Sequence, residues 1–188
     1  MTDWPVALRG VTETVVTTRG PDERWNAAAL GIRADTPATA TTWGNTRTRR
    51  NFHREGAGVV QFVSDPVVFA RAALSIHEVD EPVLESADAW ARVEVECVGE
   101  REEDETRVEE WQLAPVESEV VRERVPTVNR GFNAVVEATV AASRLGVPGY
   151  DEDVLRERLD YFTDVVDACG GAREREAMAF VERCADGD

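Results

Sequence analysis

A basic segment within an acidic chain is the first candidate for chemistry. Residues 36–54 contain four arginines and no Asp or Glu, although the whole chain has a net charge of −16. Guanidinium groups, threonine hydroxyls and the free N–H groups of a turn at Gly44 and Asn45 together offer several donors to one dianion. The segment therefore favours a phosphate site, and its alternative interpretation is a solvated arginine-rich turn.

Other chemistry has little support in the sequence. It contains no nucleophile elbow, Walker loop or dinucleotide fingerprint. We interpret His53, beside the basic segment, as a surface turn residue and assign no catalytic residue. Cys97, Cys169 and Cys184 have no CxxC spacing and no neighbouring histidine. We therefore expect no metal site, and we expect the three cysteines to be reduced and partly buried.

The composition indicates a habitat and excludes some partners. All 21 basic residues are arginine, and 37 Asp and Glu residues give a sequence pI near 4.5. Such a surface is typical of adaptation to high salt, where self-repulsion is screened. The same charge argues against binding of nucleic acid. Without a signal-peptide pattern or an apolar run of about 20 residues, we expect a cytoplasmic protein that does not cross a membrane.

Short strands are expected around the basic segment, because β-branched and alternating residues dominate there. The basic segment itself is expected to be a turn, followed by a short helical stretch within residues 51–58. Ser64 or Asp65 should cap a helix that begins at Pro66, and residues 77–89 should form an acidic loop. The expected strands span residues 12–18, 25–32, 36–43, 58–63, 90–98, 107–113 and 117–124.

The hydrophobic period changes to that of helices after Pro126. Helices are expected over residues 127–145, after Asp151, and over residues 172–184. Strands followed by helices indicate the α+β class, here an antiparallel β-barrel with a helical C-terminal portion. We place the boundary between residues 1–125 and 126–188. We expect the helices to pack on the barrel or on a dimer mate rather than to form a partner-binding hairpin.

Five blocks of the sequence, in order, resemble the domain-of-unknown-function 447 family: residues 13–18, 26–31, 45–52, 60–70 and 129–145. That family is similar to the FMN-binding split barrels, which include pyridoxamine-phosphate oxidase-like proteins and flavin reductases. The resemblance implies a six-stranded antiparallel split barrel and a homodimer with FMN at its interface. Ala29, Arg49 and Gln61 depart from the family pattern, where we expect proline, tyrosine and asparagine.

The resemblance also implies which residues contact FMN. The phosphate would be held by Thr46, Arg47, Thr48 and Asn51, with help from Arg50. The isoalloxazine would lie against the backbone of Asn26, Ala27 and Ala28. The ring or the ribityl chain would lie near Gln61, Val63 and Ser64.

Two functional hypotheses follow. The first is an FMN-dependent oxidoreductase with an unknown small-molecule substrate, in which the cofactor does the redox chemistry and the protein orients it. The resemblance adds an expected link to pterin cofactor metabolism. The second is a non-catalytic dimeric barrel that binds a phosphorylated ligand or a protein partner, because a fold does not determine a function. A bound flavin, visible as yellow colour, separates the two.

Overall fold

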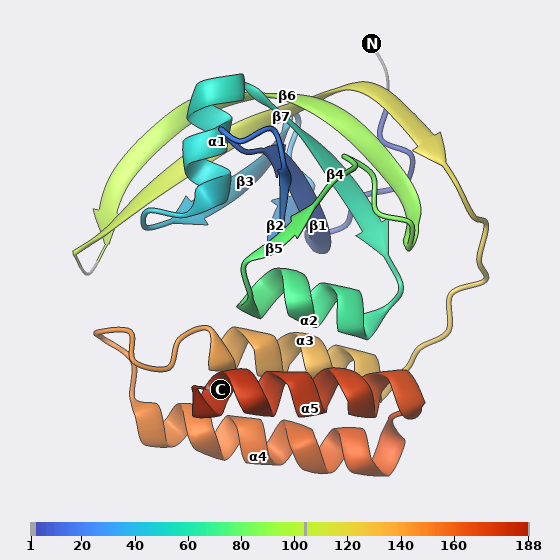
Figure 1. Ribbon diagram of the computed structural model, residues 1–188, viewed down its shortest axis with the longest axis vertical. Helices are drawn as coiled ribbons and strands as arrows, with labels where there is room; N and C mark the ends of the chain where they lie inside the picture. The colour runs from blue at the N-terminus through green and yellow to red at the C-terminus, as the bar shows by residue number, and fades with distance from the viewer. Residues whose placement is uncertain (1–2, 104, 188) are drawn as a thin grey trace. The chain divides into compact units, whose positions relative to one another are not determined.

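The N-terminal part of the chain is a closed antiparallel β-barrel (Figure 1). The computed structural model describes residues 3–103 and 105–187. Within these ranges six strands close the barrel in the order β1–β4–β6–β7–β3–β2, and β2 pairs back onto β1. They are β1 (Val11–Arg19), β2 (Trp25–Arg33), β3 (Ala38–Trp43), β4 (Ala57–Val63), β6 (Ala87–Glu103) and β7 (Thr106–Val120). The predicted α+β class and six-stranded antiparallel split barrel are confirmed.

Alternation of side chains along the strands builds the barrel core. In β6, Ala87, Ala89, Ala91 and Val93 are buried, and the residues between them are partly or fully exposed. The core also contains Val16, Ile32, Val60 and Leu113 from other strands. Phe52 closes the core from the helix that follows β3, with its ring centroid 5.1 Å from that of Trp111. A single helix is thereby fixed to the barrel by one buried aromatic pair.

The predicted basic turn is instead the helix α1 (Arg47–Glu55). Thr46 is its N-cap and accepts a hydrogen bond from the backbone N–H of Arg49 over 3.2 Å. Gly56 ends the helix at a φ of 62°, a left-handed conformation that favours glycine. The helical stretch expected within residues 51–58 is therefore the second half of a helix that begins four residues earlier.

Strands β6 and β7 form one long hairpin, which curves across the barrel in Figure 1. The sequence predicted a strand over residues 90–98 and two strands, over residues 107–113 and 117–124, in place of β7. Pro115 lies between these two expected strands, and proline cannot donate to a strand ladder. The structure keeps one strand through a bulge, since Arg92 pairs with Glu117 and the next residue, Val93, pairs with Pro115.

A short strand, β5 (His77–Val79), lies within the predicted acidic loop. It pairs antiparallel with β2, so that Glu78 lies opposite Asn26 and Trp25 opposite Val79. The strand is outside the closed barrel and adds a seventh strand to the sheet, beside β2.

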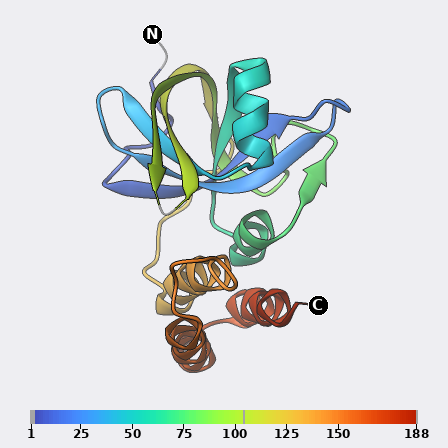
Figure 2. The ribbon, with the colours of Figure 1, turned by 90° about the vertical axis from the view of Figure 1, so that its left-hand side faces the viewer.

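The helices other than α1 form a second compact unit, which comprises Asp65–Ser75 and Val125–Asp188; Met1–Ser64 and Ile76–Arg124 form the first. Helix α2 (Pro66–Leu74), capped by Asp65, thus groups with the later helices, although the sequence-based division assigned it to residues 1–125. It contacts α3 (Arg130–Ala142) and α5 (Ala172–Asp186), and α3 also contacts α4 (Glu152–Cys169). Figure 2 views these helices almost end-on. Their shared core includes Val135, Leu155, Val166 and Val181.

Three further expectations can be compared with the described residues. Cys97 and Cys169 are exposed and only Cys184 is partly buried, so the prediction of three partly buried cysteines is wrong for two of them. No group of three or more potential metal ligands occurs among residues 3–103 and 105–187. In the same ranges, every helix is too short or too polar to span a bilayer.

Candidate functional site

Helix α1 carries a stripe of polar side chains. Arg47, Arg50, Asn51 and Arg54 follow the spacing i, i+3, i+4 and i+7, which places them on one face of a helix. All four side chains line a pocket of about 460 Å³. The helix forms here because Thr46 and Gly56 cap its ends and Phe52 anchors it to the barrel.

Three other segments complete this arginine pocket. The β1–β2 connection contributes Gly20, Pro21, Asp22 and Arg24, β2 contributes Asn26, and β5 contributes Glu78. The lining contains four arginines and two carboxylates, so it is basic in a chain whose net charge is −16. Guanidinium and amide donors on several walls suit a ligand with anionic oxygens.

Hydrogen bonds hold the pocket face of α1 in place. The side-chain amide of Asn51, which is 4% exposed, donates to Thr18 Oγ1 over 2.9 Å. Nη1 of Arg50 donates to the backbone carbonyl of Asn45 over 3.0 Å, and Nη2 of Arg54 donates to the carbonyl of Arg19. These contacts orient the side chains before any ligand binds, which lowers the entropy lost on binding.

One carboxylate connects two arginines of the pocket. Glu78 Oε2 lies 3.3 Å from Nη1 of Arg24, and Glu78 Oε1 contacts Nη1 of Arg47. Asp80, farther along, lies 3.5 Å from Nε of Arg24. The strand β5 thus places an acidic side chain between two of the four arginines of the pocket.

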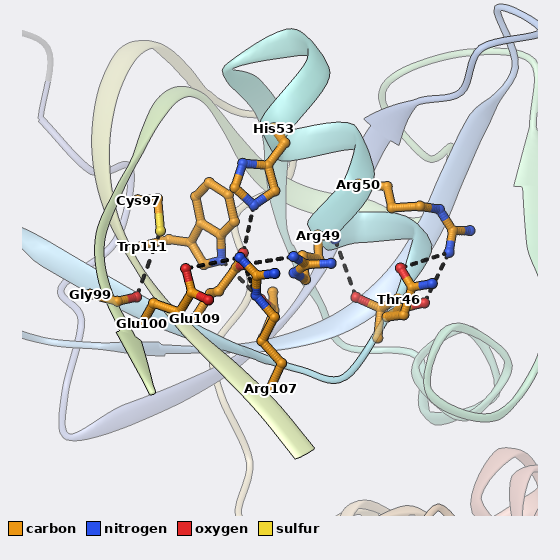
Figure 3. A network of polar contacts seen from close by, with 12 residues as sticks. Thr46, Arg49, Arg50, His53, Cys97, Gly99, Glu100, Arg107, Glu109 and Trp111 are labelled. Atoms are coloured by element: carbon orange, nitrogen blue, oxygen red, sulfur yellow. Dashed lines mark hydrogen bonds and ion pairs between the residues drawn. The ribbon is translucent and has the colours of Figure 1, made fainter. Parts of the chain in front are cut away.

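The other face of α1 contacts a fully buried carboxylate on β7 (Figure 3). Oε1 of Glu109 lies 2.7 Å from Nη2 of Arg49 and 2.8 Å from Nε of Arg107. Its Oε2 lies 2.7 Å from Nε2 of His53, whose ring also packs edge-on against Trp111. Glu109 is 0% exposed, so this Glu109 cluster fastens α1 to the barrel with charge as well as with Phe52.

The cluster keeps Glu109 ionised. Burial alone favours the protonated acid, but the contacts with Arg49 and His53 outweigh it, so the pKa of Glu109 lies below its ordinary value. The same contact raises the pKa of Arg49. Because an ionised carboxylate only accepts hydrogen bonds, Nε2 of His53 carries the hydrogen that lies between the two groups.

Some of the residues expected to contact FMN meet in the pocket. Asn26, Arg47 and Asn51 line it, and so does Arg50. Thr46 precedes them as the N-cap of α1, where its hydroxyl oxygen accepts from a backbone N–H. The basic segment therefore contributes a surface rich in hydrogen-bond donors as one helical face.

The remaining expected residues do not line this pocket. Thr48, Ala27 and Gln61 are buried, Ala28 and Val63 are partly buried, and Ser64 is exposed.

Gln61 has a full set of partners inside the barrel unit. Its Nε2 donates to Thr17 Oγ1 and to the carbonyl of Pro82, each over 3.1 Å, and its Oε1 accepts from the N–H of Leu84 over 2.6 Å. The side chain fixes the segment before β6 to β4.

Sequence reasoning missed much of the pocket and all of the Glu109 cluster. Arg24 and Glu78 lie outside the basic segment, Arg24 between two expected strands and Glu78 in the expected acidic loop, whereas Arg54 is one of the four arginines of that segment. The spacing of Arg47, Arg50, Asn51 and Arg54 is the one sequence signal that could have revealed the pocket face. No signal distinguishes Glu109 among the 37 acidic residues.

The fold is a six-stranded antiparallel split barrel, and helix α1 presents a basic face on it. The chain belongs to the DUF447 family, as the sequence predicted. The family model described as the DUF447 N-terminal domain matches residues 12–122, and the model described as protein of unknown function (DUF447) matches residues 129–183.

Solved structures resemble this chain along most of its length. An FMN-bound protein from Methanosarcina mazei, described with the same family, is 28% identical and has a TM-score of 0.80, with 95% of this chain and 96% of that chain covered. The styrene monooxygenase flavin reductase of Pseudomonas putida S12 is 14% identical and has a TM-score of 0.43, with 61% of this chain and 82% of that chain covered. A flavoredoxin from Methanosarcina acetivorans is 12% identical and has a TM-score of 0.43, with 67% of this chain and 77% of that chain covered.

Proposed function

We propose that this protein binds FMN, with the cofactor's phosphate in the arginine pocket. The observation that carries the proposal is the stripe of Arg47, Arg50, Asn51 and Arg54, held by neighbouring residues and facing a volume of about 460 Å³. The FMN-bound relative, similar over 95% of this chain, supports FMN among phosphorylated ligands.

The donor set fits a phosphate monoester. Arg47 and Arg50 offer charged N–H groups, and Asn51, whose amide donates to Thr18, holds this wall of the pocket in place. The N-terminus of a helix adds backbone N–H groups and a favourable dipole, and no acidic residue in the first turn opposes it. In this proposal Thr46, Arg47, Thr48 and Asn51 form the phosphate end of the site: Arg47 and Asn51 line the pocket, whereas Thr46 caps the helix and Thr48 is buried outside the pocket. Asn26, Ala27 and Ala28 of β2, together with Gln61, Val63 and Ser64, define the side on which the ring would lie.

We further propose that the protein is an oxidoreductase. FMN supplies hydride or electron transfer when it is bound. The side chains of this chain would then bind, orient and shield the cofactor, and a dedicated acid or base would not be required. The substrate is proposed to be a small molecule, with the link to pterin metabolism as the first class to assay.

A cytoplasmic homodimer with FMN at its interface completes the proposal. Exposed apolar side chains on the barrel, Trp43, Val98 and Val120, support a further contact surface, since isolated barrels gain nothing by exposing them. Exposed free thiols at Cys97 and Cys169 support a reducing compartment.

The test compares FMN with riboflavin, which lacks the phosphate. Arg47→Gln should weaken FMN binding by roughly tenfold or more, because a charge-assisted hydrogen bond is lost, and should leave riboflavin binding unchanged. Arg33→Gln removes an exposed arginine outside the pocket and is the matched control. Flavin fluorescence quenching measures both affinities. Light scattering on the same samples gives the mass of the protein assembly that binds the flavin and so tests the proposed homodimer.

Equal FMN affinity in the Arg47→Gln variant and in its control would contradict the phosphate site. If the protein is colourless and binds inorganic phosphate but not added FMN, the result would favour the alternative function, a non-catalytic barrel that binds another phosphorylated ligand.

A further inference from the structure

Glu78 is a carboxylate placed among the arginines of the pocket. Its backbone pairs with Asn26 in the β2–β5 ladder, so strand pairing determines its position. Its side chain, 26% exposed, accepts from Arg24 on one oxygen and from Arg47 on the other. One acidic residue thus occupies donors that belong to two different walls of the pocket.

The other two arginines have different partners. Arg50 donates to the backbone and side-chain oxygens of Asn45. Arg54 donates to the carbonyl of Arg19 and to Glu55, which does not line the pocket. An anion that enters therefore meets Glu78 as its direct rival for Arg24 and Arg47.

We infer that Glu78 is a specificity-determining residue that competes internally with anionic ligands for Arg24 and Arg47. The inference rests on the proposed function for the identity of the ligand. A phosphate monoester brings up to two charges and three acceptor oxygens, so it can replace one carboxylate with a gain in contacts. Chloride brings one charge and no directional acceptors, so it gains little by displacing a carboxylate held between two guanidinium groups.

The competition has a consequence in a salt-rich medium. Glu78 lowers the affinity of the pocket for every anion that must displace it. Chloride therefore occupies the pocket only at a higher concentration than it would without Glu78. The retained affinity for a phosphate then becomes insensitive to chloride itself, apart from general screening. Glu78 exchanges some affinity for selectivity.

The experiment measures FMN affinity of the wild type and of Glu78→Gln in potassium gluconate and in potassium chloride at equal ionic strength. In gluconate, Glu78→Gln should bind FMN about fivefold more tightly, because the removed charge no longer repels the phosphate at close range. In chloride this advantage should shrink, whereas the wild type should bind equally in the two salts. Riboflavin affinity should be the same in both proteins.

The matched control is Asp80→Asn. Asp80 also contacts Arg24 but its side chain is 89% exposed, and it does not line the pocket. This variant removes the same charge a short distance away and should change FMN affinity by less than about twofold. Circular dichroism and thermal unfolding of Glu78→Gln verify the fold, and Glu78→Ala repeats the measurement without any side chain that could accept from Arg47.

Inorganic phosphate, titrated by calorimetry, separates the two proposals. Tighter phosphate binding in both Glu78 variants supports the competition even where FMN fails to bind, and in that case only the flavin assignment falls. If neither FMN nor phosphate binds more tightly to the Glu78 variants than to the wild type, the inference is overturned.

Discussion

Glu109 is a fully buried carboxylate in contact with three basic side chains. A buried carboxylate costs several kcal/mol in desolvation unless opposite charges and hydrogen-bond donors surround it, and here the guanidinium groups of Arg49 and Arg107 and the Nε2 atom of His53 do so. Two of those partners lie on α1, the helix that presents the arginine pocket on its other face. The charge of Glu109 is thereby linked to the position of that helix.

Replacing Glu109 by glutamine should destabilise the barrel by about 3 kcal/mol at neutral pH, since it leaves the guanidinium groups of Arg49 and Arg107 facing an uncharged amide. Because the pKa of Glu109 is lower in the folded chain than in the unfolded chain, its contribution is complete above the ordinary glutamate pKa and is lost as the pH falls through the folded value. The difference between wild type and variant should therefore be large at neutral pH and small in acid.

Urea unfolding at several pH values measures this difference. Glu110→Gln is the control, because the adjacent side chain points to the opposite face of β7 and is only partly buried. A stability difference for Glu109→Gln that stays constant down to strongly acidic pH would show that its charge is not the source.

For single residues, the sequence indicated which side chains could bind an anion better than it indicated which contacts each side chain makes. The family resemblance pointed to Arg47 and Asn51, and both line the pocket. It could not identify Glu109 or Glu78, because their roles depend on strand pairing that brings β7 and β5 beside α1. The hydrogen bonds of Gln61 with the segment before β6 depend on the same long-range pairing.

Among the elements, α1 shows why a short polar helix is hard to predict. Its first turn has no acidic residue, and most of its nine residues are polar, so an apolar stripe is nearly absent. Phe52 alone enters the barrel core from this helix. The helix is stabilised by its caps and by the Glu109 cluster. The cluster depends on contacts with β7, so it cannot be predicted from the sequence of the helix alone. The longer helices were predicted well, because Leu155, Leu159 and Val166 repeat with helical spacing.

In the helical unit, the start of α3 meets the end of α4 through two glycines. A Cβ atom added at Gly131 would lie 2.6 Å from the Cα of Gly170 and 3.0 Å from its nitrogen, both backbone atoms that cannot rotate away. Gly131→Ala should therefore separate α3 from α4 and lower the free energy of unfolding by about 1–3 kcal/mol, although alanine is the better helix former.

Chemical unfolding followed by far-UV circular dichroism measures the effect of Gly131→Ala. Glu137→Ala on the exposed side of the same helix is the control, and it should be neutral or slightly stabilising. A Gly131→Ala variant as stable as this control would mean that the contact between the two glycines relaxes without cost.

For the whole molecule, the dominant property is a net charge of −16 carried by 37 acidic and 21 basic residues. The arginine pocket and the Glu109 cluster gather part of the positive charge of the barrel unit around α1, so the excess negative charge lies elsewhere on the surface. Two compact units, each with its own core, share this excess. Self-repulsion of that surface opposes folding, and salt weakens it.

The melting temperature should consequently rise as potassium chloride increases from about 0.1 M to about 1 M, over which the Debye length falls from about 10 Å to about 3 Å. A variant with Glu94, Glu96 and Glu119 changed to glutamine tests the cause, since all three are exposed. Its net charge is −13, because each change removes one negative charge from −16. It should melt at a higher temperature than the wild type in low salt and gain less from added salt. A parallel rise in both proteins would assign the effect of salt to hydration rather than to charge, and the acidic composition would then lose its meaning as an adaptation to salt.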